Sequence, residues 1–256
     1  MSLAIKRRRP DLFVEGLYCT NNATDSDHDV DISAGSCRDD ADTYDIVSSG
    51  TLTGAIDASG ANGLDTGVVA ANTWYSLWVI ADASAGTVAG LFSTSTTEAG
   101  LTYPGSYDVA RRVGWVLTDA SSNIRGFAQS KGGNHRVWTH EVDYDDFKEL
   151  TAGTATTMTA VDVSAAVPPG AIGCQAMALQ LRTASAIDAG GGLGWNPVGN
   201  QNRNWGIATG LAAGNDSTSS IIPTLPMLDG TDSIIYRVGL GTSSMDIFVT
   251  GWEDSL

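Results

Sequence analysis

The sequence predicts an all-β protein made of two β-sandwich domains, jelly-roll-like in character, with a short N-terminal arm and little helix. Three observations lead to this prediction. Short runs of β-branched and aromatic residues recur along the 256-residue chain, and clusters of Gly, Pro, Asn, Asp and Ser separate them. This spacing is typical of sandwiches and barrels. Hydrophobic residues make up 42% of the chain, which is enough to form a core, yet no apolar run approaches the roughly 18 residues of a membrane span.

We expect four segments: a basic arm at residues 1–11, a first β domain at 12–140, a linker at 141–149 and a second β sandwich at 150–256. The linker is assigned because this stretch mixes charge with few apolar residues. Beyond it, a Val-Pro-Pro-Gly segment opens a new series of strands.

The clearest strand is Thr73–Ile80, whose aromatic and aliphatic run leaves no polar face. A strand with this pattern is covered on both faces. Thr87–Ser93 follows after a turn of hairpin length, and Arg112–Thr118 and Asn123–Gln129 form another pair. The one helix expected is a short segment around Leu52–Ala58. The remaining expected strands are Leu12–Cys19, Asp29–Ser33, Tyr44–Ser48, Arg136–Val142, Thr157–Val163, Gly173–Arg182, Ile207–Leu211, Ser233–Leu240 and Asp246–Trp252.

The charge of the chain excludes some partners. The net charge is −15, and residues 1–9 carry four cations and no acid, which leaves −19 on the rest of the chain. Because this surface repels phosphates and anionic lipids, we expect neither nucleic acid nor a membrane as partner. The four cations are Lys6, Arg7, Arg8 and Arg9.

The arm is too charged to join a core, and Pro10 holds Arg9 in an extended conformation, so we expect the arm to project from the body. Two interpretations stay open. The arm folds back on the acidic surface of its own chain, or it anchors the protein to an acidic partner. Exposed ion pairs contribute only about 0.2–1 kcal/mol each, so an anchor also needs apolar contacts, for which Leu12 and Phe13 are the candidates.

Motifs of catalysis and cofactor binding are missing from the sequence. It has no Gly-x-Ser-x-Gly elbow and no Walker loop, and His140-Glu141 lacks the second His of a zinc protease. We therefore expect a protein that is not an enzyme and has no cofactor. The three cysteines are an odd, widely spaced set, so we expect three reduced thiols packed as small hydrophobes, made in a reducing cytoplasm. They are Cys19, Cys37 and Cys174.

Four aspartates alternate near the N-terminus: Asp25, Asp27, Asp29 and Asp31. On one strand all four would share a face and repel one another. Either Asp25, Asp27 and Asp29 belong to a loop that binds Ca²⁺, which takes about six to eight oxygen ligands, or the chain turns first. In the second case only Asp29 and Asp31 lie on a strand and face water, while Val30 and Ile32 face the core.

Arg111 and Arg112 are adjacent at the expected start of a strand, where neighbouring side chains point to opposite faces. One of them therefore approaches the interior or a subunit interface and needs a carboxylate partner there. The alternative is that both reach into solvent at the end of the strand.

Two tryptophans enclose a segment rich in amide side chains: Trp195, Asn196, Asn202, Arg203, Asn204 and Trp205. Indoles and amides suit sugar faces and hydroxyls, and they also suit a polar subunit interface. A loop folded on its own tryptophans is the third interpretation.

A series of short motifs over about residues 16–133 resembles a segment that recurs in virion proteins of tailed bacteriophages and gene-transfer agents. The motifs are Gly16-Leu-Tyr-Cys-Thr-Asn21-Asn22, Asp29-Val-Asp31, Gly35-Ser-Cys-Arg38-Asp39, Tyr44-Asp-Ile46, Gly63-Leu-Asp65-Thr-Gly67, Asn72-Thr-Trp74-Tyr75, Leu91-Phe92-Ser93, Pro104-Gly-Ser-Tyr107, Arg111-Arg112-Val-Gly114 and Phe127-Ala-Gln129. Farther on, Val167-Pro-Pro-Gly170 and Val249-Thr-Gly251-Trp252 resemble the C-terminal sandwich of such proteins.

The resemblance implies a virion structural protein of the tail-fibre, head-fibre or spike type, commonly a homotrimer. Its implied partners are capsid, neck or tail proteins and, for host attachment, surface glycans. Its implied location is the virion, after assembly in the host bacterial cytoplasm. Family members often carry this segment on a long shaft, whereas here it begins near residue 16, so we expect a short spike, a head fibre or a capsid decoration protein.

Overall fold

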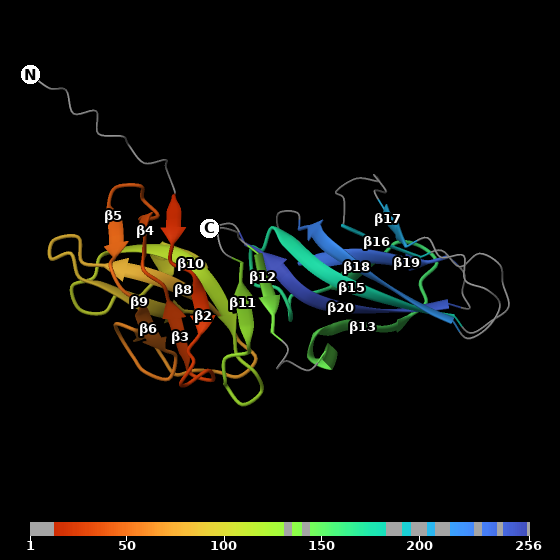
Figure 1. The fold of residues 1–256 in the computed structure, drawn as a ribbon, viewed down its shortest axis with the longest axis horizontal. Coiled ribbons are helices and arrows are strands. Elements are labelled where there is room, and N and C mark those ends of the chain that lie inside the picture. The colour runs from red at the N-terminus through yellow and green to blue at the C-terminus, as the bar shows by residue number, and fades with distance from the viewer. Residues whose placement is uncertain are drawn as a thin grey trace, which may run out of the picture. The chain divides into compact units, whose positions relative to one another are not determined.

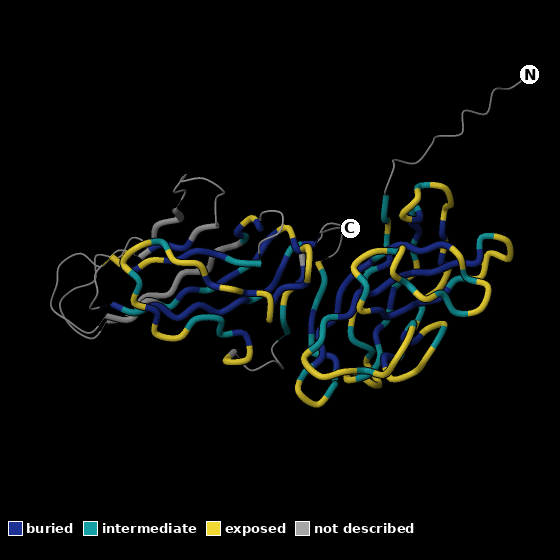
Figure 2. The backbone as a smooth tube through the Cα atoms, turned by 180° about the vertical axis from the view of Figure 1, so that it is seen from behind, coloured by how far each residue is buried: buried dark blue, intermediate teal, exposed yellow. Residues whose placement is uncertain are grey.

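The computed structural model describes residues 13–130, 135–139, 144–182, 191–195, 204–207, 216–227, 232–239 and 243–254. These residues form an all-β fold of sandwich type, as predicted (Figure 1). The chain divides after Gly133 into two compact units. In both units the buried segments follow the strands, and the exposed segments lie mainly in loops (Figure 2).

The first unit begins with three chain segments that each pass from one small sheet into another. The two sheets have the orders β1-β4-β5 and β2-β3-β6, so the same three segments lie side by side in the same order in both. We call this pair of sheets the kinked ribbon. Its strands are β1 (Val14–Gly16), β2 (Cys19–Asn21), β3 (Asp29–Ile32), β4 (Gly35–Arg38), β5 (Asp45–Ser48) and β6 (Leu52–Ala55).

The kink depends on two glycines at the point where the backbones of β1 and β4 approach each other closely. Gly16 and Gly35 are paired across the two strands, and Gly16 has a φ of 73°. A Cβ added to Gly35 would lie 2.4 Å from the carbonyl oxygen of Glu15 and 2.5 Å from the nitrogen of Leu17. Only a residue without a side chain fits this crossing.

A second sheet of the first unit packs against the kinked ribbon. Its order is β10-β8-β9-β7, and all its pairs are antiparallel except β7 with β9. The ring of Phe92 and the side chain of Ile32 fill the space beside Gly54 and Gly90, so the ribbon and the sheet lie in direct contact. The strands are β7 (Gly63–Leu64), β8 (Trp74–Ala81), β9 (Val88–Ser93) and β10 (Val109–Leu117).

Strand β8 is buried on both faces, which confirms the prediction made for Thr73–Ile80. Every residue of β8 after Trp74 is buried. On the face away from the ribbon, Trp78 and Ile80 form a cluster with Leu91, and this cluster is covered by Leu101, Tyr103 and Tyr107. These three residues follow the 3-10 turn η1 (Glu98–Gly100).

Two expectations about the first unit are wrong. Residues Leu52–Ala55 form the strand β6 and no helix. Gly54 and Ile56 are buried, while Thr53 before them is exposed and Ala55 between them is partly exposed, which is the period of a strand. The expected hairpin of residues 112–118 with 123–129 is reduced to one bridge between Thr118 and Ile124. Strand β10 pairs with β8 instead.

The second unit is a jelly roll. Its strands from β13 onward form two sheets, β13-β20-β15-β18 and β14-β19-β16-β17. Numbered from β13, the orders are 1-8-3-6 and 2-7-4-5, the strand order of two interlocked Greek keys. The strands are β13 (Lys148–Gly153), β14 (Thr159–Asp162), β15 (Gly173–Arg182), β16 (Gly191–Trp195), β17 (Asn204–Ile207), β18 (Asp216–Pro226), β19 (Ser233–Val238) and β20 (Ser243–Glu253).

Strand β20 is paired on both edges. Strand β15 accompanies it from Ser243 to Glu253. The other edge is shared by β13, which pairs with Met245–Phe248, and by β12 (His135–Trp138), which pairs with Gly251–Glu253.

The predicted domain boundary is therefore too late, and the predicted linker 141–149 is wrong in part. The sequence places residues 135–138 in the first domain, whereas strand β12 pairs within the second unit. Its Trp138 stacks on Phe147 of the 3-10 turn η2 (Tyr144–Phe147), with ring centroids 4.2 Å apart. Arg136 and Asp254 form an ion pair of 3.9 Å with both side chains fully buried. These contacts attach residues 135–138 to the jelly roll.

We predict that Gly35→Ala lowers the stability of the first unit by about 1–3 kcal/mol, the usual cost of overpacking, because the new Cβ meets fixed backbone atoms. Gly50→Ala is the matched control, since a Cβ at Gly50 meets nothing within 4 Å. Thermal unfolding followed by circular dichroism measures both. Equal melting temperatures for the two variants would contradict the close approach at Gly35.

Candidate functional site

Phe13, which follows the basic arm in the sequence, lies next to the end of β4. Lys6, Arg7, Arg8, Arg9 and Leu12 lie outside the described residues, and Phe13 is the first residue described. The carbonyl of Phe13 accepts a hydrogen bond from the backbone N–H of Arg38 (3.1 Å). The arm therefore joins the kinked ribbon at the end of β1 that lies beside Arg38.

An acidic loop, residues 39–45, lies at the same end of the ribbon and runs from the end of β4 to Asp45, the first residue of β5. It contains four aspartates. Arg38 forms ion pairs with two of them, Asp42 at 3.4 Å and Asp45 at 3.3 Å. The charge of the loop exceeds that of Arg38, so the loop remains negative.

Arg111 and Arg112 point to different surroundings, as expected for neighbours on a strand. Arg111 is buried and pairs with Asp40 at 3.4 Å, while Arg112 lies 5.0 Å from the centroid of the Trp115 ring. Burial raises the pKa of Asp40, and the charge of Arg111 opposes that rise. The side chain of Asp40 is one third exposed, so water also solvates this pair and limits its contribution to stability.

The run of aspartates follows the second of its two interpretations. Strand β3 begins at Asp29, with Val30 and Ile32 fully buried and Asp29 and Asp31 less buried between them. Oδ1 of Asp31 accepts a hydrogen bond from the side chain of Thr53 (2.7 Å) on the neighbouring strand. The carboxylates of the strand thus face away from the core.

Asp25 and Asp27 lie in the turn before this strand. Oδ1 of Asp25 accepts a hydrogen bond from the backbone N–H of His28 (3.2 Å) and lies 3.0 Å from Nδ1 of its ring. The side-chain hydrogen bond to Asp25 raises the pKa of His28. Over the part of the chain that the structure describes, no group of three or more His, Cys, Asp or Glu side chains is placed to hold a metal ion.

The two ends of the tryptophan-rich segment lie on two antiparallel strands of the jelly roll, β16 and β17. Trp195 ends β16, and Asn204 and Trp205 begin β17, where Trp205 is opposite the buried Leu193. Asn196, Asn202 and Arg203 lie outside the described residues. The backbone thus brings the two tryptophans to adjacent strands at one end of one sheet.

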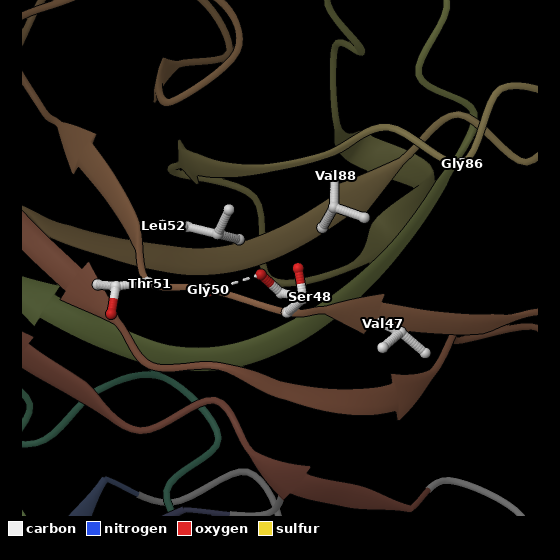
Figure 3. Close-up of a pocket in the computed structure, with 8 residues that line it drawn as sticks. Val47, Ser48, Gly50, Thr51, Leu52, Gly86 and Val88 are labelled. Carbon is white, nitrogen blue, oxygen red and sulfur yellow. Dashed lines mark hydrogen bonds between the residues drawn. The ribbon is translucent and has the colours of Figure 1, made fainter.

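Sequence reasoning missed an open hollow at the corner where β5 turns into β6. It measures about 270 Å³ and is lined by residues 47–52 together with Gly86 and Val88. Figure 3 shows Val47 of β5, Leu52 of β6 and Val88 of β9 around it. Its walls come from segments that lie far apart in the sequence, residues 47–52 and residues 86–88, so no local sequence pattern marks it.

Several carboxylates hold the protein's own loops. Oδ1 of the buried Asp39 accepts hydrogen bonds from the backbone N–H groups of Thr43 and Tyr44. Asp82 accepts hydrogen bonds in the β8–β9 turn, and bonds from Ser106 and Ser84 lower its pKa. Carboxylate oxygens that accept hydrogen bonds from nearby residues in this way cap the turns. This use of Asp explains how an acidic chain stabilises long loops.

The three cysteines are buried and free, as predicted. Burial raises the pKa of the Cys37 and Cys174 thiols to about 12. Because the thiolate is the reactive form, these thiols are chemically inert at neutral pH.

Comparison with known proteins gives no assignment: no protein-family model and no curated protein sequence matches this chain. Within the described ranges, no helix is long and apolar enough to span a membrane.

We predict that the pKa of His28 lies above 6.5 and that Asp25→Asn lowers it, because the hydrogen bond to Asp25 favours the charged imidazole. The stabilisation from this pair is complete below pH 6.5 and is lost as the pH rises through the raised pKa. It is small, because the two side chains are 39% and 49% exposed.

Histidine NMR titration measures the shift in the pKa of His28, with His28→Gln to assign the resonance. Asp57→Asn is the control, since Asp57 acts only through its charge; an equal or larger effect at Asp57 would contradict the account.

Proposed function

We propose that this chain is a non-enzymatic structural component of a bacteriophage-like particle, a short tail-fibre or spike-type appendage anchored by its N-terminal segment. The observation that carries the proposal is the ordered series of motifs over residues 16–133, which resembles virion proteins of tailed phages. A head fibre or a capsid decoration protein is the alternative form of the same role.

The roles of the motif residues support a scaffold. The side chain of Asn21 accepts a hydrogen bond from the backbone N–H of Phe127 (3.0 Å), and Gln129 accepts one from the N–H of Cys19 (2.9 Å). Asp65 accepts a hydrogen bond from the Ser93 hydroxyl (2.7 Å). These polar motif residues bind other parts of the same chain, which is what a rigid particle component requires.

The jelly roll of the second unit also supports the proposal, because this fold is common in viral capsid proteins and lectins. In the proposed role the partners are capsid, neck or tail proteins and further copies of the chain, as a homotrimer. The proposed location is the virion, after assembly in the host cytoplasm. Fold alone does not establish function, so the motif series remains the main support.

The direct experiment is immunogold labelling of particles made by the organism that encodes the chain, with antibodies raised against the full protein. We predict regular labelling at one location on the particle, and a reconstruction of the particle then distinguishes head from tail. Deletion of residues 1–9 should preserve the circular dichroism spectrum and lower incorporation. Particles without label would reject the virion role.

A second candidate function is binding of host surface glycans, favoured by the two tryptophans at the end of the antiparallel β16–β17 pair in a lectin-like fold. A glycan array with the wild type and the Trp195→Ala/Trp205→Ala double variant tests it, with Tyr44→Ala, an exposed aromatic of the first unit, as control. Binding lost only in the double variant would support this function. No binding by the wild type would reject it.

A further inference from the structure

Strand β5 (Asp45–Ser48) has an open outer edge. It lies at the end of the order β1-β4-β5, and no strand among the described residues pairs with its outer side. Of the usual protections of such an edge, β5 has a short length of four residues and the charge of Asp45, but no Lys, Pro or β-bulge. Strand β5 has the sequence Asp-Ile-Val-Ser, and its register with β4 is unbroken. Its backbone groups are therefore available to another extended segment.

Apolar surface lies at the C-terminal end of this edge. Val47 is 58% exposed. The hollow described above begins there. Most of its accessible lining is polar, and the partly exposed Leu52 and Val88 supply apolar walls (Figure 3). Its volume of about 270 Å³ is sufficient for an aliphatic side chain.

Negative charge lies at the N-terminal end of the same edge. The acidic loop carries four aspartates, and the arginines that pair with them are Arg38 and Arg111. The charges of Arg112 and Glu98 also act on Asp40, in opposite directions, so the loop remains negative. A segment that lies along β5 meets apolar surface at one end and negative charge at the other.

We propose that residues 3–8 of a second copy add to the outer edge of β5 as an antiparallel strand. In this segment the apolar Leu3 and Ile5 precede the cations that begin at Lys6. Leu3 and Ile5 share one face of an extended chain. Antiparallel addition places Leu3 and Ile5 beside the hollow and the cations beside the acidic loop. Parallel addition would place the cations beside the hollow and the apolar residues beside the acidic loop. Strand addition of this kind combines main-chain hydrogen bonds with pockets for alternate side chains.

The topology favours a second copy over the chain's own arm. Strand β1 lies at the opposite edge of the β1-β4-β5 sheet. To reach the outer side of β5, the own arm must cross three interstrand spacings, roughly 14 Å, and pass around the acidic loop within residues 9–13. The arm of a second copy has no such constraint. The contact is heterologous, so repeated copies close into a ring or extend as a chain. This inference does not depend on the proposed virion role, but it assigns the basic arm to a second copy, whereas the proposed anchor assigns the arm to a particle protein.

Disulfide trapping tests the contact in the full-length protein. Ile5→Cys and Val47→Cys are made as separate proteins with different tags and mixed under mild oxidation. We expect a crosslink that joins one of each, at a yield that falls in high salt because charge pairs are screened. Val68→Cys replaces Val47→Cys in the control, since Val68 is 85% exposed in another loop. The native thiols are buried and do not compete.

Equal yields at positions 47 and 68 would overturn the proposal. So would a crosslink formed within one chain of the Ile5→Cys/Val47→Cys double variant in place of one between copies, because it would show that the chain's own arm occupies the edge.

Light scattering gives an independent measurement: the wild type should have the mass of several copies and the deletion of residues 1–9 the mass of one. A wild type of single-copy mass, or a deletion variant of unchanged mass, would also overturn it. Particle labelling tests the virion role separately.

Discussion

Each unit is organised around one long apolar strand that must be covered on both faces and paired on both edges. In the first unit this strand is β8, with β9 and β10 at its edges, the kinked ribbon on one face and the segment after η1 on the other. In the second unit it is β20, with β15 on one edge and β12 and β13 on the other. Burial of apolar surface contributes roughly 25 cal/mol per Å², and the fully buried tryptophans Trp78 and Trp252 belong to these two strands. The layers and the strand orders follow from the need to enclose them.

The sequence predicts those structural features that depend on a local pattern of residues. The unbroken apolar run of β8 predicts burial on both faces, and the alternation at Asp29 and Asp31 predicts a strand with one polar face. The pattern failed at Leu52–Ala55 because Gly54, which has no side chain, occupies a buried position against Phe92. The pattern predicts a strand at Arg136–Val142, which overlaps β12, but it places this strand in the wrong unit, because the charged Arg136 is fully buried against Asp254. The partner that buries Arg136 is more than a hundred residues away, and no local window contains it.

In the candidate sites, too, the sequence predicts some features and only the fold identifies the others. The adjacent arginines predict that one side chain needs a buried carboxylate, but Asp40 is 71 residues from Arg111 and only the fold identifies it. The acidic composition predicts repulsion of anions. The composition does not indicate the role of any individual carboxylate. The structure shows that Asp39 and Asp82 cap turns. The Asp39 cap holds the acidic loop beside the open edge of β5, and the proposed self-association through the basic arm is argued from this combination.

The account rests on the claim that β8 and β20 are the most enclosed elements of their units. Native-state hydrogen exchange of the full chain, resolved by NMR or mass spectrometry, measures this directly, because amides that open only on global unfolding exchange most slowly. We expect the slowest exchange in the first unit along Trp74–Ala81 and in the second along Ser243–Glu253, with faster exchange at the edge strand β5. Exchange along β8 as fast as along β5 would contradict the organisation described for the first unit.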